Sequence, residues 1–353
     1  MNQLRLVFWE TTTACNLKCI HCRACATEQR PPDELSFDQS AMLLRDIAQF
    51  AKPVVILSGG EPTVRDDIFD IASLGTDLGL RMVLATNATT LTSQYALKLA
   101  QSGIQRISVS IDGADNDSHD AFRGVPGAFE GAVNGIEHIK SAGIPFQVNV
   151  SVTRASIADL PRILDMSMSL GACAMHLFLL VPTGCGKEIA DTEMISPEQY
   201  ENVLNWLYDA SLTSPISLKA TCAPHYFRVS RQRGGVKTPD NAPKSHLEAV
   251  SKGCLAGSAV CFVSARGDVY PCGYFPLSAG NILDTPFQKI WEESELFTKL
   301  RNPSLLTGKC GGCEFKNICG GCRARAYAET GDYLSEEPYC TYSPNKAQNA
   351  RTV

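Results

Sequence analysis

The sequence lacks any stretch that approaches about 18 uninterrupted apolar residues, so it predicts no membrane-spanning helix. Its first ten residues lack a positively charged segment followed by an apolar core, and we therefore expect no secretory signal and a cytoplasmic protein. Positive charge is also scarce, because 37 Asp and Glu outnumber 32 Lys and Arg. Proteins that follow nucleic-acid phosphates usually carry clustered Lys and Arg, so the composition gives no indication of a nucleic-acid partner.

Cysteine, by contrast, is abundant, with 15 residues in a chain of 353. In a small secreted domain this number would indicate a disulfide framework, but the chain is long and places its cysteines at short spacings. In a reducing compartment such cysteines more often bind metal than form disulfides. We therefore favour metal or iron–sulfur binding.

The first half of the sequence alternates short β-branched apolar runs with segments of helical periodicity, of which 36–50, 92–102 and 131–143 are examples. This alternation predicts an α/β fold with a parallel sheet and right-handed crossovers. Evenly repeated units favour a curved sheet, a partial (β/α)6 barrel of the TIM type, in which active groups gather at the C-terminal ends of the strands. The expected strands are 4–10, 54–58, 81–86, 106–112, 146–152 and 175–181.

Three parts are expected along the chain: a barrel core over 1–185, a helical and loop bridge over 186–246, and a cysteine-rich domain over 247–353. In the bridge, a helix should begin with Ser196 as N-cap and Pro197 at its first position. A loop rich in Gly, Pro and Lys, RQRGGVKTPDNAPKS, should follow it.

Cys15, Cys19 and Cys22 follow the first expected strand with the spacing C-x3-C-x2-C. Three thiolates on one loop can hold three irons of a [4Fe–4S] cube and leave the fourth iron without a protein ligand. An open iron can chelate the amino and carboxylate groups of a methionine moiety. A structural zinc site is the alternative, since Cys25 offers a fourth thiolate, although zinc favours paired spacings.

The segment CNLKCIHC (15–22) resembles the signature of the radical S-adenosylmethionine (SAM) superfamily. Further segments are similar to the family's SAM-binding positions: SGGEP (58–62), ATNATTL (85–91), SVSIDG (108–113) and AFRG (121–124). The resemblance implies contacts to three parts of SAM, and without it the same residues would be turn glycines and polar residues at strand ends. The implied contacts are Gly59, Gly60 and Glu61 with the amino group, Asn87 with the ribose, and Ser110 and Arg123 with the carboxylate.

Eight cysteines follow in the C-terminal third, which is the number that two fully ligated [4Fe–4S] clusters need, although two zinc knuckles would use as many. After a radical SAM barrel, the pattern resembles the SPASM extension, which houses two auxiliary clusters. Between Cys319 and Cys322 this chain has two residues, where the family often has three. The sequence therefore does not decide whether there are one or two clusters, or which cysteines bind each of them. The resemblance implies a first auxiliary group of Cys254, Cys261, Cys272 and Cys322 and a second of Cys310, Cys313, Cys319 and Cys340.

Four cysteines remain outside these groups. Cys173 is most simply a small buried residue, whereas Cys25 and Cys185 are expected on the active face. Cys222 stands close before His225, and Cys or His can be an axial ligand of haem iron, although a capped turn without metal is the simpler interpretation.

A basic stretch near the expected domain junction contains four cations. Substrate carboxylates need such cations, although a solvated run of charge is the commoner explanation. The four residues are Arg228, Arg231, Arg233 and Lys237.

Longer segments narrow the resemblance to the radical SAM enzymes of the alternative, sirohaem-derived haem pathway, and the short N-terminus is most similar to the haem b synthase branch. These segments are HCRACA (21–26), LVPTGCGKE (180–188), KATCAPHYFR (219–228) and the stretch 310–340. The resemblance implies SAM, [4Fe–4S] clusters, an iron tetrapyrrole substrate and a low-potential electron donor of ferredoxin or flavodoxin type.

The implied reaction is the oxidative decarboxylation of two propionates of iron-coproporphyrin III to vinyl groups. Acetate removal from didecarboxysirohaem and dioxo-isobacteriochlorin formation are related alternatives. A SPASM peptide maturase is another, but such enzymes commonly carry an N-terminal recognition domain, and here the first strand is expected from residue 4. A non-catalytic zinc or iron–sulfur scaffold would need neither the GGEP segment nor Arg123.

Overall fold

A computed structural model of the chain describes residues 3–235 and 253–344, and in it ten strands form one sheet. Lys237 and residues 236–245 of the predicted loop lie outside the described residues. The strands are β1 (Leu6–Glu10), β2 (Val54–Ser58), β3 (Arg81–Thr86), β4 (Ile107–Ser110), β5 (Phe146–Val152), β6 (Ala174–Leu179), β7 (Ser217–Thr221), β8 (Val260–Val263), β9 (Asp268–Tyr270) and β10 (Gly280–Asn281).

The strand order is β10-β9-β8-β1-β2-β3-β4-β5-β6-β7, and every pair from β8 through β7 is parallel. β9 and β10 continue the β8 edge as antiparallel strands. The predicted parallel α/β sheet is therefore confirmed, and all six expected strands are present. β7 and β8 extend it beyond six strands. They were not predicted because β7 is mostly polar and β8 has only four residues.

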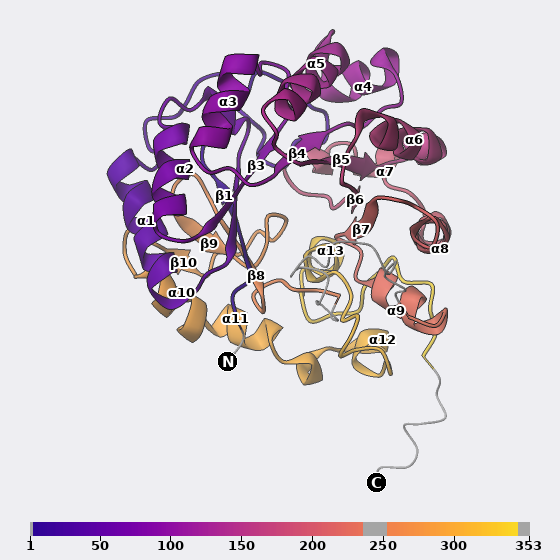
Figure 1. The fold of residues 1–353 in the computed structure, drawn as a ribbon. Helices are drawn as coiled ribbons and strands as arrows, with labels where there is room; N and C mark the ends of the chain where they lie inside the picture. The colour runs from indigo at the N-terminus through magenta and orange to yellow at the C-terminus, as the bar shows by residue number, and fades with distance from the viewer. Residues whose placement is uncertain (1–2, 236–252, 345–353) are drawn as a thin grey trace.

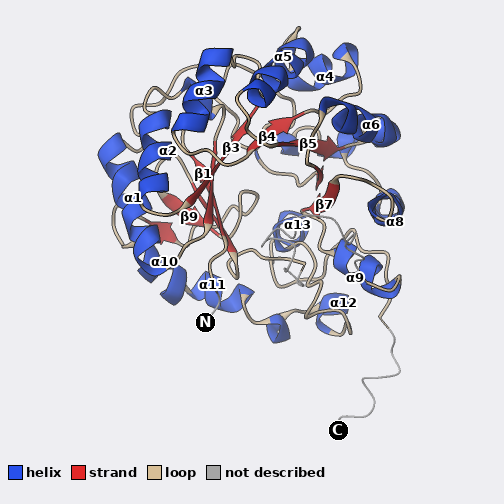
Figure 2. Cartoon of the chain, viewed as in Figure 1, coloured by secondary structure: helices blue, strands red, loops and turns tan. Residues whose placement is uncertain are grey.

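The helices of the first half lie along the outer side of the curved sheet, and α13 lies between the two ends of the row of parallel strands (Figure 1). Figure 2 shows the strands as a continuous arc inside the ring of helices. The helices are α1 (Phe37–Phe50), α2 (Ile68–Asp77), α3 (Ser93–Gln101), α4 (Asn116–Arg123), α5 (Ala128–Ser141), α6 (Leu160–Leu170), α7 (Ala190–Glu193), α8 (Pro197–Ser211), α9 (His225–Gln232), α10 (Phe287–Glu293), α11 (Glu295–Leu300), α12 (Gly308–Gly311) and α13 (Arg323–Thr330).

Local sequence signals explain where several helices begin. Ser36 and Gln39 form a capping box at the start of α1, in which each side chain binds the backbone N–H of the other residue. The predicted start of α8 is confirmed, since Ser196 is its N-cap and Pro197 its first residue. A Ser or Thr cap stabilises a helix by about 1 kcal/mol.

The main core lies between the sheet and the outer helices. Trp9, Leu57, Leu84 and Val109 are fully buried in it, one from each of β1 to β4. Burial of one leucine or valine side chain contributes roughly 1.5–3 kcal/mol, so this layer fixes the strands, and the loops at their C-terminal ends start from a rigid frame.

The sheet runs across both predicted domain boundaries. β7 lies in the predicted bridge and pairs with β6, and β8 lies in the predicted cysteine-rich domain and pairs with β1. The boundaries at residues 185 and 246 stay predictions. Over the described ranges, no helix has both the length and the apolar character needed to cross a membrane.

Candidate active site

The three cysteines of the first group lie on the loop that follows β1, and each sulfur has an N–H donor nearby. The backbone N–H groups of Leu17 and Ala26 lie 3.4 Å from the sulfurs of Cys15 and Cys22. Arg123 Nη1 lies 3.6 Å from the sulfur of Cys19. Such donors stabilise thiolates, which are the form in which cysteine binds iron.

The Cys15 sulfur is close enough to Cys19 and Cys22 to interact with both electrostatically. Burial, with smaller contributions from Glu61, Cys19 and Cys22, raises the pKa of the Cys15 thiol to about 11. Burial likewise raises the pKa of the Cys19 thiol. Cys15 and Cys19 therefore favour their neutral thiol form when nothing is bound, and a bound cation would stabilise the thiolates. These residues fit a positively charged group such as an iron–sulfur cube.

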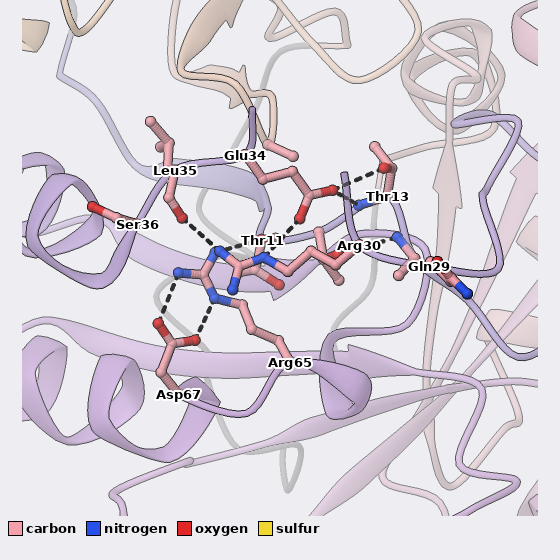
Figure 3. Close-up of polar contacts among 12 residues, drawn as sticks. Thr11, Thr13, Gln29, Arg30, Glu34, Leu35, Ser36, Arg65 and Asp67 are labelled. Atoms are coloured by element: carbon pink, nitrogen blue, oxygen red, sulfur yellow. Dashed lines mark hydrogen bonds and ion pairs between the residues drawn. The ribbon is translucent and has the colours of Figure 1, made fainter. Parts of the chain in front are cut away.

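Hydrogen bonds from two buried charged side chains, Arg65 and Glu34, hold the start of this loop (Figure 3). Arg65, whose side chain has no exposed area, donates from Nη1 to the carbonyl of Thr11 at 2.6 Å. The same guanidinium binds both carboxylate oxygens of Asp67, at 2.5 and 3.0 Å. On the other side of the loop, Glu34 Oε1 accepts from the backbone and hydroxyl of Thr13, at 2.6 and 2.8 Å.

The GGEP segment packs directly on the backbone that leads to Cys15. Gly60 N and Glu61 N donate to the carbonyls of Thr12 and Ala14, both at 2.8 Å. A Cβ atom at Gly59 would lie 2.3 Å from the Thr12 carbonyl oxygen, and one at Gly60 would lie 2.3 Å from that of Ala14. No side chain fits at either position, so the glycines are explained by close approach of two chain segments.

The Glu61 side chain joins the end of β2 to the end of β3. It is fully buried and accepts hydrogen bonds from Thr63 Oγ1 at 2.7 Å, Thr86 Oγ1 at 2.8 Å and Asn87 N at 2.7 Å. Burial raises the pKa of this carboxyl. The side chain therefore positions the next loop. Because the Glu61 N–H donates to Ala14, the Glu61 carbonyl is the group left for the predicted contact with the amino group of SAM.

Asn87 lies against the cysteine loop. Its Nδ2 atom donates to Asn16 Oδ1 at 2.8 Å and lies 4.0 Å from the Cys15 sulfur. Ser110, the last residue of β4, is half-buried and stands in register with Asn149 of β5. Asn87 and Ser110 thus lie at the C-terminal ends of β3 and β4, where a barrel of this type was expected to carry its functional groups.

Arg123 ends α4 and contacts the cysteine loop with both its backbone and its side chain. Its carbonyl accepts from Lys18 N at 3.2 Å. Its guanidinium forms a buried ion pair with Asp112, whose other oxygen accepts from Ser151 N at 2.5 Å. Arg123 Nε is buried and has no hydrogen-bond partner among the described residues. One donor of the fork therefore remains for a bound carboxylate.

The second auxiliary group converges on one pocket. Its four cysteines line this pocket together with His225 and Arg228. Both ring nitrogens of His225 are buried and lack a partner within the described part of the chain. A bound cluster would supply the missing acceptor, because its sulfurs can accept N–H hydrogen bonds. The pocket therefore fits a bound cluster, which would be held by the four cysteines and would accept a hydrogen bond from His225.

The structure brings together only part of the predicted first auxiliary group. Cys272 and Cys322 share a small apolar cluster, and Cys254 is an electrostatic neighbour of both. Cys261 lies elsewhere, fully buried in β8 within the main core. Cys222, which the SPASM resemblance did not place in this group, packs with Cys272 and Cys322.

Among residues 3–235 and 253–344, no three His, Cys, Asp or Glu side chains converge as the ligands of one metal ion do.

Two of the three described cations of the predicted basic stretch, Arg228 and Arg233, are paired with carboxylates of the protein itself. Arg228 binds both oxygens of Glu201, at 3.0 and 2.5 Å, and Arg233 binds both oxygens of Asp209, at 3.0 and 2.6 Å. Arg231 is exposed. The contacts of Arg228 and Arg233 favour a structural role over substrate binding.

A buried arginine that the sequence did not suggest connects α13 to the ends of β6 and β7. Arg325 has no exposed area, pairs with Glu337 at 3.3 Å, and donates to the carbonyls of Leu180 at 3.1 Å and Cys222 at 3.2 Å. Its guanidinium carbon also lies 5.1 Å from the ring centre of Tyr200 and 5.5 Å from that of Tyr339. No spacing or motif around an isolated helical arginine marks such a role.

Comparison with known proteins identifies two stretches. Residues 9–166 match the radical SAM superfamily, and residues 254–323 match SPASM, an iron-sulfur cluster-binding domain. An "AdoMet-dependent heme synthase" of Methanosarcina barkeri is 51% identical over 346 residues, which are 98% of each chain. A "Fe-coproporphyrin III synthase" of the same organism is 28% identical over 351 residues, covering 95% of this chain and 87% of the relative.

The solved structures agree on the fold. The crystal structure of Streptococcus suis SuiB bound to S-adenosylmethionine matches 97% of this chain and 78% of SuiB, with a TM-score of 0.74 and 17% sequence identity. At this identity the likeness supports the shared architecture of barrel and C-terminal extension.

Proposed function

Because the chain belongs to the radical SAM superfamily, in the SPASM-bearing group that includes the AdoMet-dependent heme synthases, we propose that it converts two propionates of iron-coproporphyrin III into vinyl groups, giving haem b. As a member of this superfamily it is an enzyme that uses SAM and [4Fe–4S] clusters. The observation that carries the specific reaction is the 51% identity to the M. barkeri heme synthase, which extends over 98% of both chains.

The loop after β1 supports the proposed assignment of its thiols. Cys15, Cys19 and Cys22 would hold three irons and leave one open. When bound, the cluster and SAM supply the 5′-deoxyadenosyl group that removes a hydrogen atom from a propionate β-carbon. The residue roles for SAM follow the family positions: Gly59, Gly60 and Glu61 for the amino group, Asn87 for the ribose, and Ser110 and Arg123 for the carboxylate.

Among the proposed SAM contacts, the one between Arg123 and the SAM carboxylate has the strongest structural support. The buried Nε of Arg123 has no partner among the described residues, and this one remaining donor can form a charge-assisted hydrogen bond to the carboxylate of SAM. Asp112 holds the other end of the fork, so the side chain is oriented before SAM binds.

Electron balance gives the C-terminal cysteines a function. Removal of one hydrogen atom and loss of carbon dioxide turn a propionate into a vinyl group and release one electron. We propose that an auxiliary cluster accepts it. For the electron that starts the reaction we propose a ferredoxin or flavodoxin type donor, and the cytoplasm as location, because thiolate ligands need a reducing compartment.

The test is an anaerobic incubation of the full-length protein with SAM, a low-potential reductant and iron-coproporphyrin III, followed by mass spectrometry. Two successive losses of one carbon dioxide and two hydrogens are expected, and a Cys22→Ala variant should show none. Parallel incubations with didecarboxysirohaem address the related reactions. Loss of acetate groups there, without change to iron-coproporphyrin III, would assign the chain to a different tetrapyrrole reaction.

A further inference from the structure

We propose that Cys222 supplies the fourth thiolate of the first auxiliary cluster, with Cys254, Cys272 and Cys322, and that Cys261 does not bind this cluster. The inference depends on the auxiliary cluster of the SPASM domain and not on the proposed haem reaction. It adds a ligand from outside the matched SPASM residues, 254–323.

Cys222 directly follows β7, at the end of the parallel strands where the cysteine loop also lies. It belongs to the same small apolar cluster as Cys272 and Cys322, together with Val181 and Phe275. Its electrostatic neighbours include Cys322, Cys272 and Cys254, so all four thiols lie near one another.

The chain around Cys254 runs between the other two ligand segments. Cys254 N donates to the Cys319 carbonyl at 3.1 Å, next to the Cys322 turn. A Cβ atom at Gly253 would lie 2.8 Å from the Cβ of Pro224, two residues beyond Cys222. These backbone contacts hold the segments of Cys222, Cys254 and Cys322 side by side.

Strand geometry keeps Cys261 on the opposite face of the sheet. Phe262 faces the cysteine loop, because its ring lies 4.3 Å from the guanidinium carbon of Arg23. A Cβ atom at Gly273 would lie 3.3 Å from the same ring, so Cys272 and its neighbours lie on that face too. Successive side chains of a strand point to opposite faces. Cys261 therefore faces the helices, in register with Val7 of the main core.

The backbone at Cys222 is held in an unusual conformation. Its φ of 59° lies in the left-handed region, which non-glycine residues rarely adopt. Such residues persist where the surroundings impose the conformation, often at functional sites. Here the carbonyl accepts from Tyr200 Oη at 2.9 Å and Arg325 Nη2 at 3.2 Å, two buried side chains. The fold thus fixes this residue, as a ligand position requires.

The test compares Cys222→Ala with Cys261→Ala in the full-length protein that also carries Cys15→Ala, Cys19→Ala and Cys22→Ala, so that only auxiliary clusters remain. Iron and sulfide content and electron paramagnetic resonance are measured after anaerobic reconstitution. We expect Cys222→Ala to lose one [4Fe–4S] equivalent or to convert it to a [3Fe–4S] signal. Cys261→Ala should keep the full content and an unchanged spectrum.

Cys222→Ser, which nearly preserves side-chain volume, guards against misfolding, and far-UV circular dichroism of all variants checks the fold. A serine variant that folds and has an altered cluster spectrum supports the assignment. Loss of a cluster in Cys261→Ala with retention in Cys222→Ala overturns it, as does the same cluster content in both variants. None of these readouts involves haem formation, so they stand apart from the test of the proposed reaction.

Discussion

The sulfur of Cys185 lies 2.7 Å from the sulfur of Cys25. The loop that carries Cys185 rests on the first cysteine loop, because Cys185 N donates to the Cys22 carbonyl at 2.9 Å. Cys25 therefore has a partner from the end of β6 and does not stand free to join the three ligands of the first group. The contact argues against the alternative in which Cys25 is the fourth thiolate ligand beside Cys15, Cys19 and Cys22.

We expect Cys25→Ser to retain the SAM-cleaving cluster. The variant should keep its iron content, and the electron paramagnetic resonance signal of the reduced cluster should still shift when SAM is added. Cys22→Ala serves as the control that loses both properties. Absence of the SAM-induced shift in Cys25→Ser would show that Cys25 is a ligand and would remove the open iron on which the function depends.

Gly60→Ala should disrupt the same loop by a steric route. Its new methyl group would lie 2.3 Å from the Ala14 carbonyl oxygen, and a rigid backbone atom cannot move aside cheaply. We expect at least a tenfold loss of 5′-deoxyadenosine formation, the equivalent of about 1.4 kcal/mol. Gly186→Ala is the matched control, since its nearest contact would be an ordinary 3.5 Å. Equal activity of the two variants would contradict the steric explanation.

Arg123→Lys tests the carboxylate contact. Lysine keeps a positive charge beside Asp112 but lacks the planar fork of donors. Loss of a hydrogen bond to a charged group costs about 1.5–3 kcal/mol, so SAM should bind roughly 10- to 100-fold more weakly. Equilibrium binding of SAM to the reconstituted protein measures this, and urea unfolding confirms that the variant is folded. An unchanged dissociation constant would assign Arg123 to a structural role alone.

His119 makes the stability of the barrel depend on pH. Its Nδ1 accepts from Asp112 N at 3.1 Å, and burial lowers its pKa to about 4. The unfolded imidazole has a pKa of about 6.5, so between these values the unfolded state binds more protons. The free energy of unfolding should therefore fall as the pH falls through this window, by up to about 1.4 kcal/mol per unit.

His119→Asn keeps an acceptor for the Asp112 N–H but does not titrate, so its stability should fall less steeply with acid. Urea unfolding at pH 7 and pH 5 compares the two proteins. His176, whose burial lowers its pKa to about 3, contributes to both and cancels in the difference. An equal loss of stability in both proteins would show that protonation of His119 is not coupled to folding.

Strands and helix starts that depend on a few neighbouring residues could be predicted from the sequence. The apolar runs of β2, β3 and β5 and the Ser196 cap are encoded within a few residues, and the structure places them as expected. β7 was missed because its side chains are mostly polar and half-buried, so that it carries no apolar run.

Contacts between distant segments were harder to predict. The spacing of Cys254 and Cys261 is the same whether or not Cys261 faces the helices, because the face depends on the register of β8 against β1. Cys222 follows β7, and it meets Cys272 and Cys322 only after the whole sheet has formed. The pairs Cys25–Cys185 and Arg325–Glu337 likewise join residues from separate loops and helices, and no local pattern encodes them.

The second auxiliary group allows a test of the path of the released electron. Cys310→Ala with Cys313→Ala removes two of the four thiols that line the pocket beside His225 and leaves the first cysteine loop unchanged. If this pocket holds the acceptor, 5′-deoxyadenosine should still form, because SAM cleavage needs only the first cluster, whereas vinyl formation should fall at least tenfold.

Mass spectrometry of the porphyrin and chromatography of 5′-deoxyadenosine separate the two steps. Cys173→Ala is the matched control, because Cys173 directly precedes β6, at the N-terminal end of the strand, and its thiol donates to the Phe146 carbonyl at 3.0 Å. Full vinyl yield in the double variant would exclude this pocket as the required acceptor, since each decarboxylation must still release its electron. The group around Cys322 would then be the remaining candidate acceptor.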